Sequence, residues 1–144
     1  MNTSIRKVGI VGAGQMGSGI AEVCAIAGFA GMLNDVGADR VKTALANIES
    51  HLARQVAAGK LTESELKTTL GHLSAAPGYD AFSDADLVIE AAVEDEAVKR
   101  QILRNVSGSL KPEAILATNT SSISITRLAA ATDRPERFIG IHFM

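Results

Sequence analysis

Apolar runs of strand length alternate with segments that are apolar at helical spacing along most of the chain. Residues 5–11 are rich in β-branched residues, and the segment after them, 15–27, repeats apolar residues every three or four positions. The whole pattern predicts strands over residues 5–11, 30 to about 35, 73–75, 86–92, 114–118 and 138–143. It predicts helices over residues 15–27, 38–58, 96–110 and 124–130, and a short helix that Thr62 and Glu65 cap.

This alternation of strands and helices is typical of an α/β protein. It predicts one Rossmann-type domain over residues 1–144, a doubly wound, mostly parallel sheet with helices on both faces. The composition agrees: 47% of the residues are hydrophobic but only 3% are aromatic, so aliphatic side chains must build the core. In such sheets ligands bind beyond the carboxyl ends of the strands, so polar residues at those ends are candidates for function.

The turn after the first strand has the sequence GAGQMG, which is the GxGxxG spacing of dinucleotide-binding turns. In such turns the first glycine (Gly12) permits a tight bend, and the second (Gly14) lets the backbone approach a pyrophosphate. The third (Gly17) lets the helix pack closely on the strand. Asp35 ends the second strand, near the distance at which an acidic residue binds an adenosine ribose. The alternative is a plain strand-to-helix turn with an incidental aspartate.

Charge and the length of the apolar runs exclude several other classes of protein. The chain has 14 basic and 16 acidic residues and a formal net charge of −2, so we expect no nucleic-acid partner. No apolar run is long enough to span a bilayer, and residues 1–4 do not resemble a signal peptide. We therefore expect no membrane partner and a cytoplasmic location. The single cysteine, Cys24, excludes an internal disulfide, and no metal site is expected.

Three groups of polar residues follow the later strands. Glu90 and Glu94 come after the fourth strand, with Lys99 on the next helix. The sequence NTSS over residues 119–122 follows the fifth strand, and His142 lies near the end of the sixth. A dinucleotide whose adenosine half lies over the first two strands would extend its nicotinamide toward these groups. There an imidazole can accept a hydroxyl proton while hydride leaves the same carbon, and a hydroxyl or amide can hydrogen-bond the oxygen.

Each group also has a purely structural interpretation. Glu94 and Lys99 could form a solvated surface pair, which contributes little to stability. Residues 119–122 could cap the helix that follows them. His142, on an apolar strand, could be a structural histidine. His51, on the second helix, lies away from this edge of the sheet and is interpreted as incidental.

Several stretches together resemble the 3-hydroxyacyl-CoA dehydrogenase family, including its bacterial 3-hydroxybutyryl-CoA dehydrogenases. The resemblance covers essentially the whole chain, in the family's order. It rests on GAGQMGSGIA (12–21), the Asp-Val pair at 35–36, IEAAVEDEAVKRQIL (89–103), ATNTSSISIT (117–126) and PERFIGIHFM (135–144).

The resemblance implies a role for each matching residue. The turn from Gly12 to Gly17 would bind the pyrophosphate of NAD, and Asp35 its adenine ribose. Arg40 leaves NADP open, although a carboxylate at position 35 repels a 2′-phosphate. The other implied roles are cofactor contact for Gln15, Met16, Glu94, Lys99 and Asn119, substrate-oxygen contact for Ser121 and Asn119, acid–base catalysis for His142, and coenzyme A contact for Ser50, Arg54 and Lys60.

The sequence departs from the family after its histidine. There the family has Asn-Pro, a glutamate that pairs with the histidine, and a helical domain that closes the cleft and forms a homodimer. This chain stops at Met144. We therefore expect it to be the cofactor-binding part of a longer enzyme, with the homodimer belonging to the full-length form.

The leading hypothesis is NAD-dependent oxidation of an L-3-hydroxyacyl-CoA to the 3-oxoacyl-CoA. A non-catalytic NAD(H)-binding module and a dehydrogenase of a free 3-hydroxy acid are the alternatives. Cofactor binding without turnover would indicate the first alternative, and indifference to the coenzyme A moiety would indicate the second.

Overall fold

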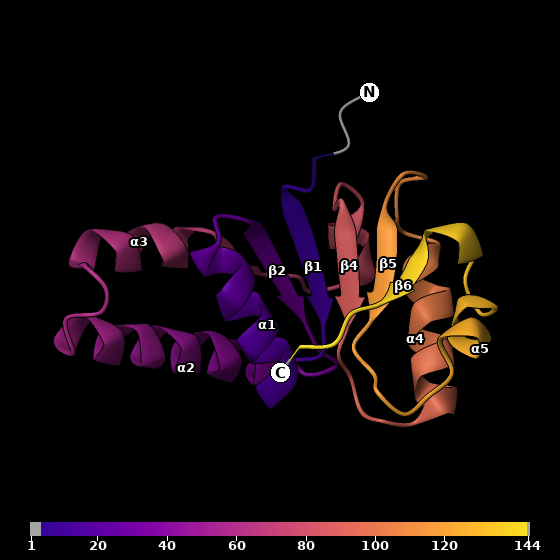
Figure 1. The fold of residues 1–144 in the computed structure, drawn as a ribbon, viewed down its shortest axis with the longest axis horizontal. Coiled ribbons are helices and arrows are strands. Elements are labelled where there is room, and N and C mark those ends of the chain that lie inside the picture. Colours follow the sequence, from indigo (N-terminus) through magenta and orange to yellow (C-terminus); the bar gives the residue numbers. More distant parts are fainter. Residues whose placement is uncertain (1–3, 144) are drawn as a thin grey trace.

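A computed structural model describes residues 4–143, in which a single parallel sheet of six strands lies at the centre (Figure 1). The strands are β1 (Lys7–Val11), β2 (Ala30–Asn34), β3 (Leu73–Ala75), β4 (Leu87–Glu90), β5 (Ile115–Thr118) and β6 (Phe138–Gly140). The helices are α1 (Gln15–Ile26), α2 (Ala38–Ala57), α3 (Glu63–Gly71), α4 (Glu96–Ser107) and α5 (Ile125–Ala129), with 3-10 helices η1 (Tyr79–Phe82) and η2 (Pro135–Arg137).

The strand order β3-β2-β1-β4-β5-β6 confirms the predicted doubly wound, Rossmann-type fold. The chain builds outward from β1 to β3 and then crosses back, so that β4 pairs with the other side of β1. The order therefore reverses between β1 and β4. All carboxyl ends point to one edge, the lower one in Figure 1, where the loops after β1, β4 and β5 converge.

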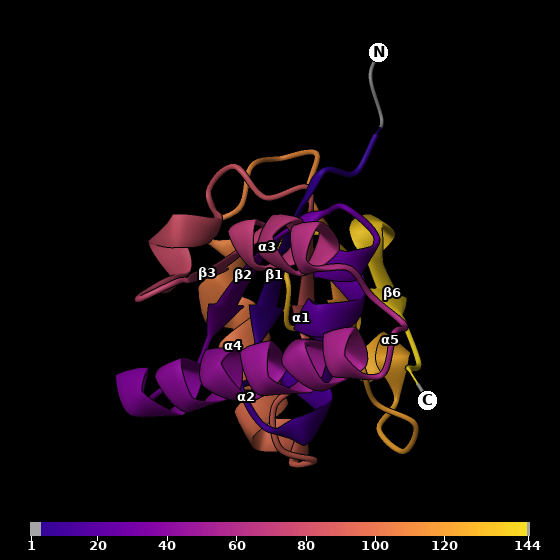
Figure 2. The same ribbon diagram turned by 90° about the vertical axis from the view of Figure 1, so that its left-hand side faces the viewer.

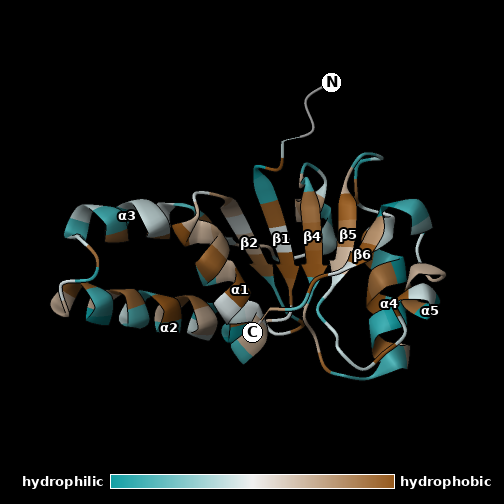
Figure 3. Cartoon of the chain, viewed as in Figure 1, coloured by the Kyte–Doolittle hydropathy of each residue, from teal (hydrophilic) through white to brown (hydrophobic). Residues whose placement is uncertain are grey.

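Two separate hydrophobic cores lie on opposite faces of this sheet. Within β1, Ile10 belongs to one core and Val11 to the other, because successive residues of a strand point to opposite faces. Helices α1 and α2 cover the first core, to which α2 contributes Ile48. Helices α4 and α5 cover the second, to which α4 contributes Leu103. Figure 3 shows the result, with hydrophobic strands in the middle and hydrophilic residues on the outer surfaces of the helices.

Helices α2 and α3 form a hairpin that projects from one side of the sheet (Figure 1), and Figure 2 views this hairpin from its own side. Gly59 follows the end of α2 and has φ +74°, a backbone conformation that favours glycine. The predicted capping box then starts α3: the Thr62 hydroxyl accepts from the Glu65 amide, and the Glu65 carboxylate accepts from the Thr62 amide.

The structure shortens several of the predicted elements, and the first strand begins at Lys7 rather than at residue 5. The fourth strand is confined to Leu87–Glu90, because Asp86 turns its carboxylate onto the backbone of β1 and the chain bends after Glu90. The sixth strand ends at Gly140, so His142 follows the strand rather than lying in it. The helix predicted over 96–110 ends at Ser107, because the Arg134 guanidinium donates to the carbonyl oxygens of Ser107 and Leu110.

Two predictions fall partly outside the described residues. They are the motif that ends in Met144 and the prediction that residues 1–4 do not form a signal peptide. Within residues 4–143, no helix combines the length and the apolar character that a membrane crossing requires.

Candidate functional site

The glycine turn after β1 can accept only glycine at the first and third glycine positions of its GxGxxG motif. Gly12 has φ +112°, and a Cβ there would lie 2.6 Å from the Ala91 carbonyl oxygen. A Cβ on Gly17 would lie 1.6 Å from the Gly12 carbonyl oxygen. The predicted tight turn and the close helix–strand contact are therefore both present, and they bring the start of α1 against the carboxyl ends of β1 and β4.

The start of α1 is open to a ligand. A Cβ on Gly14, the residue before the helix, would meet nothing within 4 Å. In the described part of the chain, no side chain caps this end of the helix, and its first turn carries no acidic residue. Free amide groups and the positive end of the helix dipole favour an anion here. The geometry fits the pyrophosphate of a dinucleotide.

Asp35 lies beside this opening. Its Oδ2 accepts a hydrogen bond of 2.7 Å from the Ala13 amide, and its side chain is 9% exposed. Its other oxygen accepts from the Val36 amide and lies 3.4 Å from the Arg40 guanidinium. Burial and, after it, the nearby Asp35 charge raise the pKa of Tyr79. The carboxylate thus joins the end of β2 to the glycine turn, at the position predicted for a ribose contact.

A second hollow, of about 330 Å³, opens beside the glycine turn at the carboxyl ends of β4 and β5. The structure brings together here five residues that come from widely separated parts of the sequence. They are Met16 from α1, Glu94 from the loop after β4, Asn119 and Ser121 from the loop after β5, and His142 from the segment after β6. His142 is exposed, which does not agree with a buried structural histidine.

Glu94 is the charged group on the wall of this hollow, with its side chain 47% exposed. Burial raises its pKa, but hydrogen bonds from Thr120, Ser122 and Lys99 outweigh that effect and hold the pKa below its usual value. Glu94 is therefore a carboxylate at neutral pH. Lys99 is completely buried behind it, so the alternative of a solvated surface pair is wrong.

The loop after β5 is held from both sides. The hydroxyl groups of Thr120 and Ser122 each donate to Glu94 over 2.7 Å. The side-chain oxygen of Asn119 accepts from the Phe143 amide, which ties the loop to the segment that carries His142. The cap of α5 is Ser124, whose hydroxyl accepts from the Arg127 amide, so residues 119–122 are not the cap of that helix.

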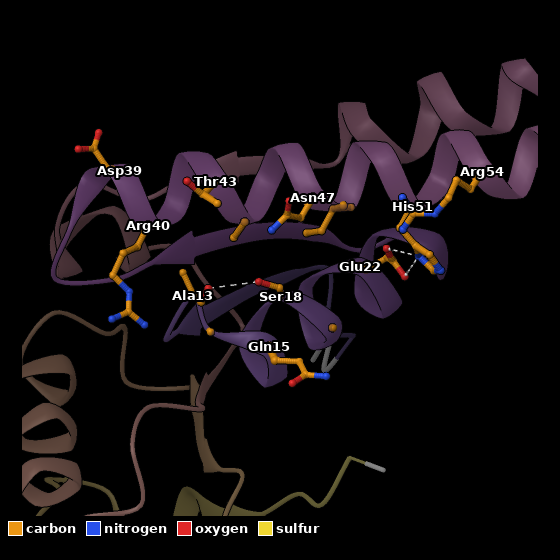
Figure 4. Close-up of a pocket in the computed structure, with 14 residues that line it drawn as sticks. Ala13, Gln15, Ser18, Glu22, Asp39, Arg40, Thr43, Asn47, His51 and Arg54 are labelled. Atoms are coloured by element: carbon orange, nitrogen blue, oxygen red, sulfur yellow. Dashed lines mark hydrogen bonds and ion pairs between the residues drawn. The ribbon is translucent and has the colours of Figure 1, made fainter.

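A larger pocket, of about 820 Å³, lies between α1 and α2 (Figure 4). Its inner end is the glycine turn, with Gly14 and Gln15, and Arg54 lies on its wall. The pocket lining does not include the other two predicted coenzyme A residues, Ser50 and Lys60.

His51 also lines this pocket, and its Nδ1 lies 2.8 Å from the Glu22 carboxylate (Figure 4). The sequence pattern alone favours an incidental role for His51. The signal in the sequence that indicates this pocket is the spacing of Arg40, Thr43, Asn47, His51 and Arg54, which puts five polar side chains on one face of α2.

Three comparisons with known proteins identify the family of this chain. Residues 7–144 match the family model described as 3-hydroxyacyl-CoA dehydrogenase, NAD binding domain. The chain is 60% identical over 144 residues to a 3-hydroxybutyryl-CoA dehydrogenase of Bradyrhizobium diazoefficiens, covering 100% of this chain and 49% of that protein. It is 46% identical to the enzyme of that name in Mycobacterium tuberculosis, covering 99% of this chain and 50% of the relative.

The fold is shared as well. The crystal structure of (S)-3-hydroxybutyryl-CoA dehydrogenase from Ralstonia eutropha superposes with a TM-score of 0.95 at 45% identity, over 98% of this chain and 50% of that one. The chain therefore spans about half the length of the relatives it matches. Because the matching family is an NAD-binding domain, the prediction of NAD as the cofactor is confirmed. The chain belongs to the 3-hydroxyacyl-CoA dehydrogenase family, of which it contains the NAD-binding domain.

Proposed function

We propose that this chain provides the NAD-binding part of an enzyme that oxidises L-3-hydroxyacyl-CoA to 3-oxoacyl-CoA. One observation carries the proposal: Met16, Glu94, Asn119, Ser121 and His142 line one hollow beside the glycine turn. A dinucleotide bound with its pyrophosphate at the start of α1 would present its nicotinamide to that hollow. The names of the relatives supply the substrate class.

The cofactor would bind at the glycine turn and at Asp35 beside it. The turn from Gly12 to Gly17, with Gln15 and Met16, would hold the pyrophosphate through backbone amides. Asp35 would accept hydrogen bonds from the adenine ribose, and its charge would disfavour a 2′-phosphate. Arg40 already faces Asp35 at 3.4 Å, so its charge is directed to that carboxylate, which favours NAD over NADP.

NAD, when bound, supplies the acceptor for a hydride from C3 of the substrate. His142 would accept the hydroxyl proton, since a neutral imidazole is a suitable base near pH 7. The Asn119 side-chain oxygen accepts from the Phe143 amide, so the NH₂ group of Asn119 is the part of the side chain that would donate to the substrate oxygen. The Ser121 hydroxyl would supply a second hydrogen bond to the same oxygen.

Coenzyme A would lie along α2, in the pocket between α1 and α2. This pocket starts at the glycine turn and carries the Arg54 guanidinium, which suits a phosphate group. Ser50 and Lys60 belong to the same helical hairpin and would contact the outer end of the ligand. We also propose that the full-length protein forms a homodimer and that it is located in the cytoplasm.

The decisive experiment measures NADH oxidation with acetoacetyl-CoA. It uses this chain, this chain joined to the second half of the Bradyrhizobium diazoefficiens relative, and His142→Gln in both. We expect turnover in the joined protein and its loss in His142→Gln, with NADH affinity unchanged. NADH binding without turnover in both proteins would instead favour a non-catalytic module, and equal rates with free acetoacetate would favour a free-acid dehydrogenase.

A further inference from the structure

Glu90, the last residue of β4, is a completely buried carboxylate to which the proposed chemistry assigns no role. Its Oε1 accepts from the Thr118 hydroxyl at 2.7 Å and from the Lys99 ammonium at 3.0 Å. Its Oε2 accepts from the Ala92 amide and from Lys99, each at 2.7 Å. Both oxygens are thus fully used inside the protein, at the point where the strand order reverses.

The Lys99 ammonium has three donors, and all three are engaged. Besides Glu90 it contacts Glu94 at 3.1 Å and the Ala92 carbonyl oxygen at 3.2 Å. Since Lys99 is completely buried, it could reach a bound cofactor only by giving up one of these partners. The ammonium is therefore placed to hold the loop after β4 rather than to bind a ligand.

The contacts continue from Lys99 to the surface of the hollow. Glu94 receives the ammonium on one oxygen and the hydroxyl groups of Thr120 and Ser122 on the other. A continuous series of charge-assisted hydrogen bonds thus runs from the end of β4, through α4, to the loop after β5. That loop carries Asn119 and Ser121, which are proposed to contact the substrate oxygen.

We infer that Glu90 is a positioning residue: through Lys99 it fixes Glu94 and the loop 119–122 around the nicotinamide end of the cofactor. Stability alone does not explain this pair, because apolar residues of similar volume can replace a buried ion pair with little loss of folding stability. Geometry gives a better reason, since each partner has one orientation that satisfies all its hydrogen bonds. This inference rests on the proposed function, in which the nicotinamide lies at this hollow.

The test compares two ligands that share the adenosine and pyrophosphate groups. NADH carries the nicotinamide and ADP-ribose does not, so a defect confined to the nicotinamide end changes the affinity for NADH alone. In Glu90→Gln the amide oxygen still accepts from Thr118, but the charge that holds Lys99 is lost. Outer hydrogen-bond partners of metal ligands contribute about 10–100-fold in affinity, and we expect a loss of about tenfold for NADH here. ADP-ribose should stay within about twofold of wild type, which verifies that the variant is folded.

A matched control and a double variant complete the design. Glu96→Gln removes a neighbouring carboxylate that pairs with Arg127 on the surface, and it should change neither affinity. The double variant Glu90→Gln/Lys99→Met removes both buried charges, so it should regain thermal stability while NADH binding stays weak, because Glu94 has lost its ammonium partner. Full recovery of NADH binding in the double variant would show that the pair is merely structural and would overturn the inference.

The two proposals fail in different ways. A wild-type chain that binds neither ligand would overturn the proposed function together with this inference. A wild-type chain that binds both ligands, with an unchanged affinity ratio in Glu90→Gln, would overturn the inference alone.

Discussion

Replacing Gly17 with alanine tests the close approach between the start of α1 and the Gly12 carbonyl group. The new Cβ would lie 1.6 Å from the Gly12 carbonyl oxygen and 2.7 Å from the Gly12 carbonyl carbon. A tolerable carbon–oxygen contact is about 3.3 Å. The start of α1 must therefore move away from the end of β1 by roughly 1.7 Å, which is the difference between these two distances. Both sides of the contact are backbone, so no side chain can rotate to relieve it.

Two opposing contributions determine the size of the effect. Forcing an extra methyl group into a packed core costs about 1–3 kcal/mol, and a clash with backbone belongs at the upper end of that range or above it. Alanine also improves helix propensity by about 1 kcal/mol over glycine. We therefore expect Gly17→Ala to lose a net free energy of unfolding of about 2 kcal/mol or more.

Urea denaturation followed by circular dichroism measures this loss, and titration with NADH measures its effect on the pyrophosphate site. Gly19→Ala, in the same helix, is the matched control: its Cβ would meet nothing within 4 Å, so stability should rise by about 1 kcal/mol. Gly14→Ala should leave the fold intact and weaken NADH binding, since the methyl group would occupy the open approach to the backbone. A Gly17→Ala variant as stable as Gly19→Ala would refute the argument.

Three further predictions concern stability. Arg134→Met leaves the carbonyl groups of the loop after α4 without their buried donor and should cost about 3 kcal/mol in urea denaturation; wild-type stability would show that water replaces the guanidinium. Thr62→Ala removes the capping box with Glu65 and should cost about 1 kcal/mol by the same measurement. For Asp86, hydrogen bonds from Lys111 and from the β1 backbone lower the pKa to about 2. A depressed carboxyl pKa stabilises the folded state above the unfolded pKa and loses that contribution as pH falls, so wild type should lose stability between about pH 4 and pH 2. Asp86→Asn should lack most of that acid-dependent loss in a pH series of thermal unfolding, and an unchanged profile would remove this carboxyl group from the explanation.

Local chemistry made much of the fold predictable. The apolar periodicity identifies each strand of the sheet, and the Thr62–Glu65 spacing identifies the start of α3 because both partners of the capping box lie within one turn. The strand ends were harder to predict. At β4 the chain bends because the Glu90 side chain accepts the Ala92 amide, and no propensity of these residues indicates that contact.

Some residues of the candidate site could also be predicted from the sequence, and others could not. Gly12, Gly17 and Asp35 could be found because their spacing is set within one strand–helix–strand unit. For Lys99 the sequence left a solvated surface pair open as an alternative, because the partners of Lys99 come from the end of β4 and the loop after it, which a helical projection of α4 cannot display. Arg134 gave no signal at all, since its acceptors are backbone carbonyl groups 20 or more residues earlier in the sequence, such as Ala114 at 20 and Ser107 at 27.

The strand order also has a consequence for how the protein is made. β1 pairs with β4 in a register that joins Val8 to Leu87, a separation of 79 residues, the difference between these numbers. After the glycine turn has left the ribosome, most of the domain must therefore be synthesised before Ala91, which packs against Gly12 of that turn, exists. Until then α1 and β1 form a half-site with one side of the strand unpaired, open to wrong pairing. The cofactor site is consequently encoded early in the chain and completed late in translation, so slow or interrupted synthesis of residues 80–92 would expose it.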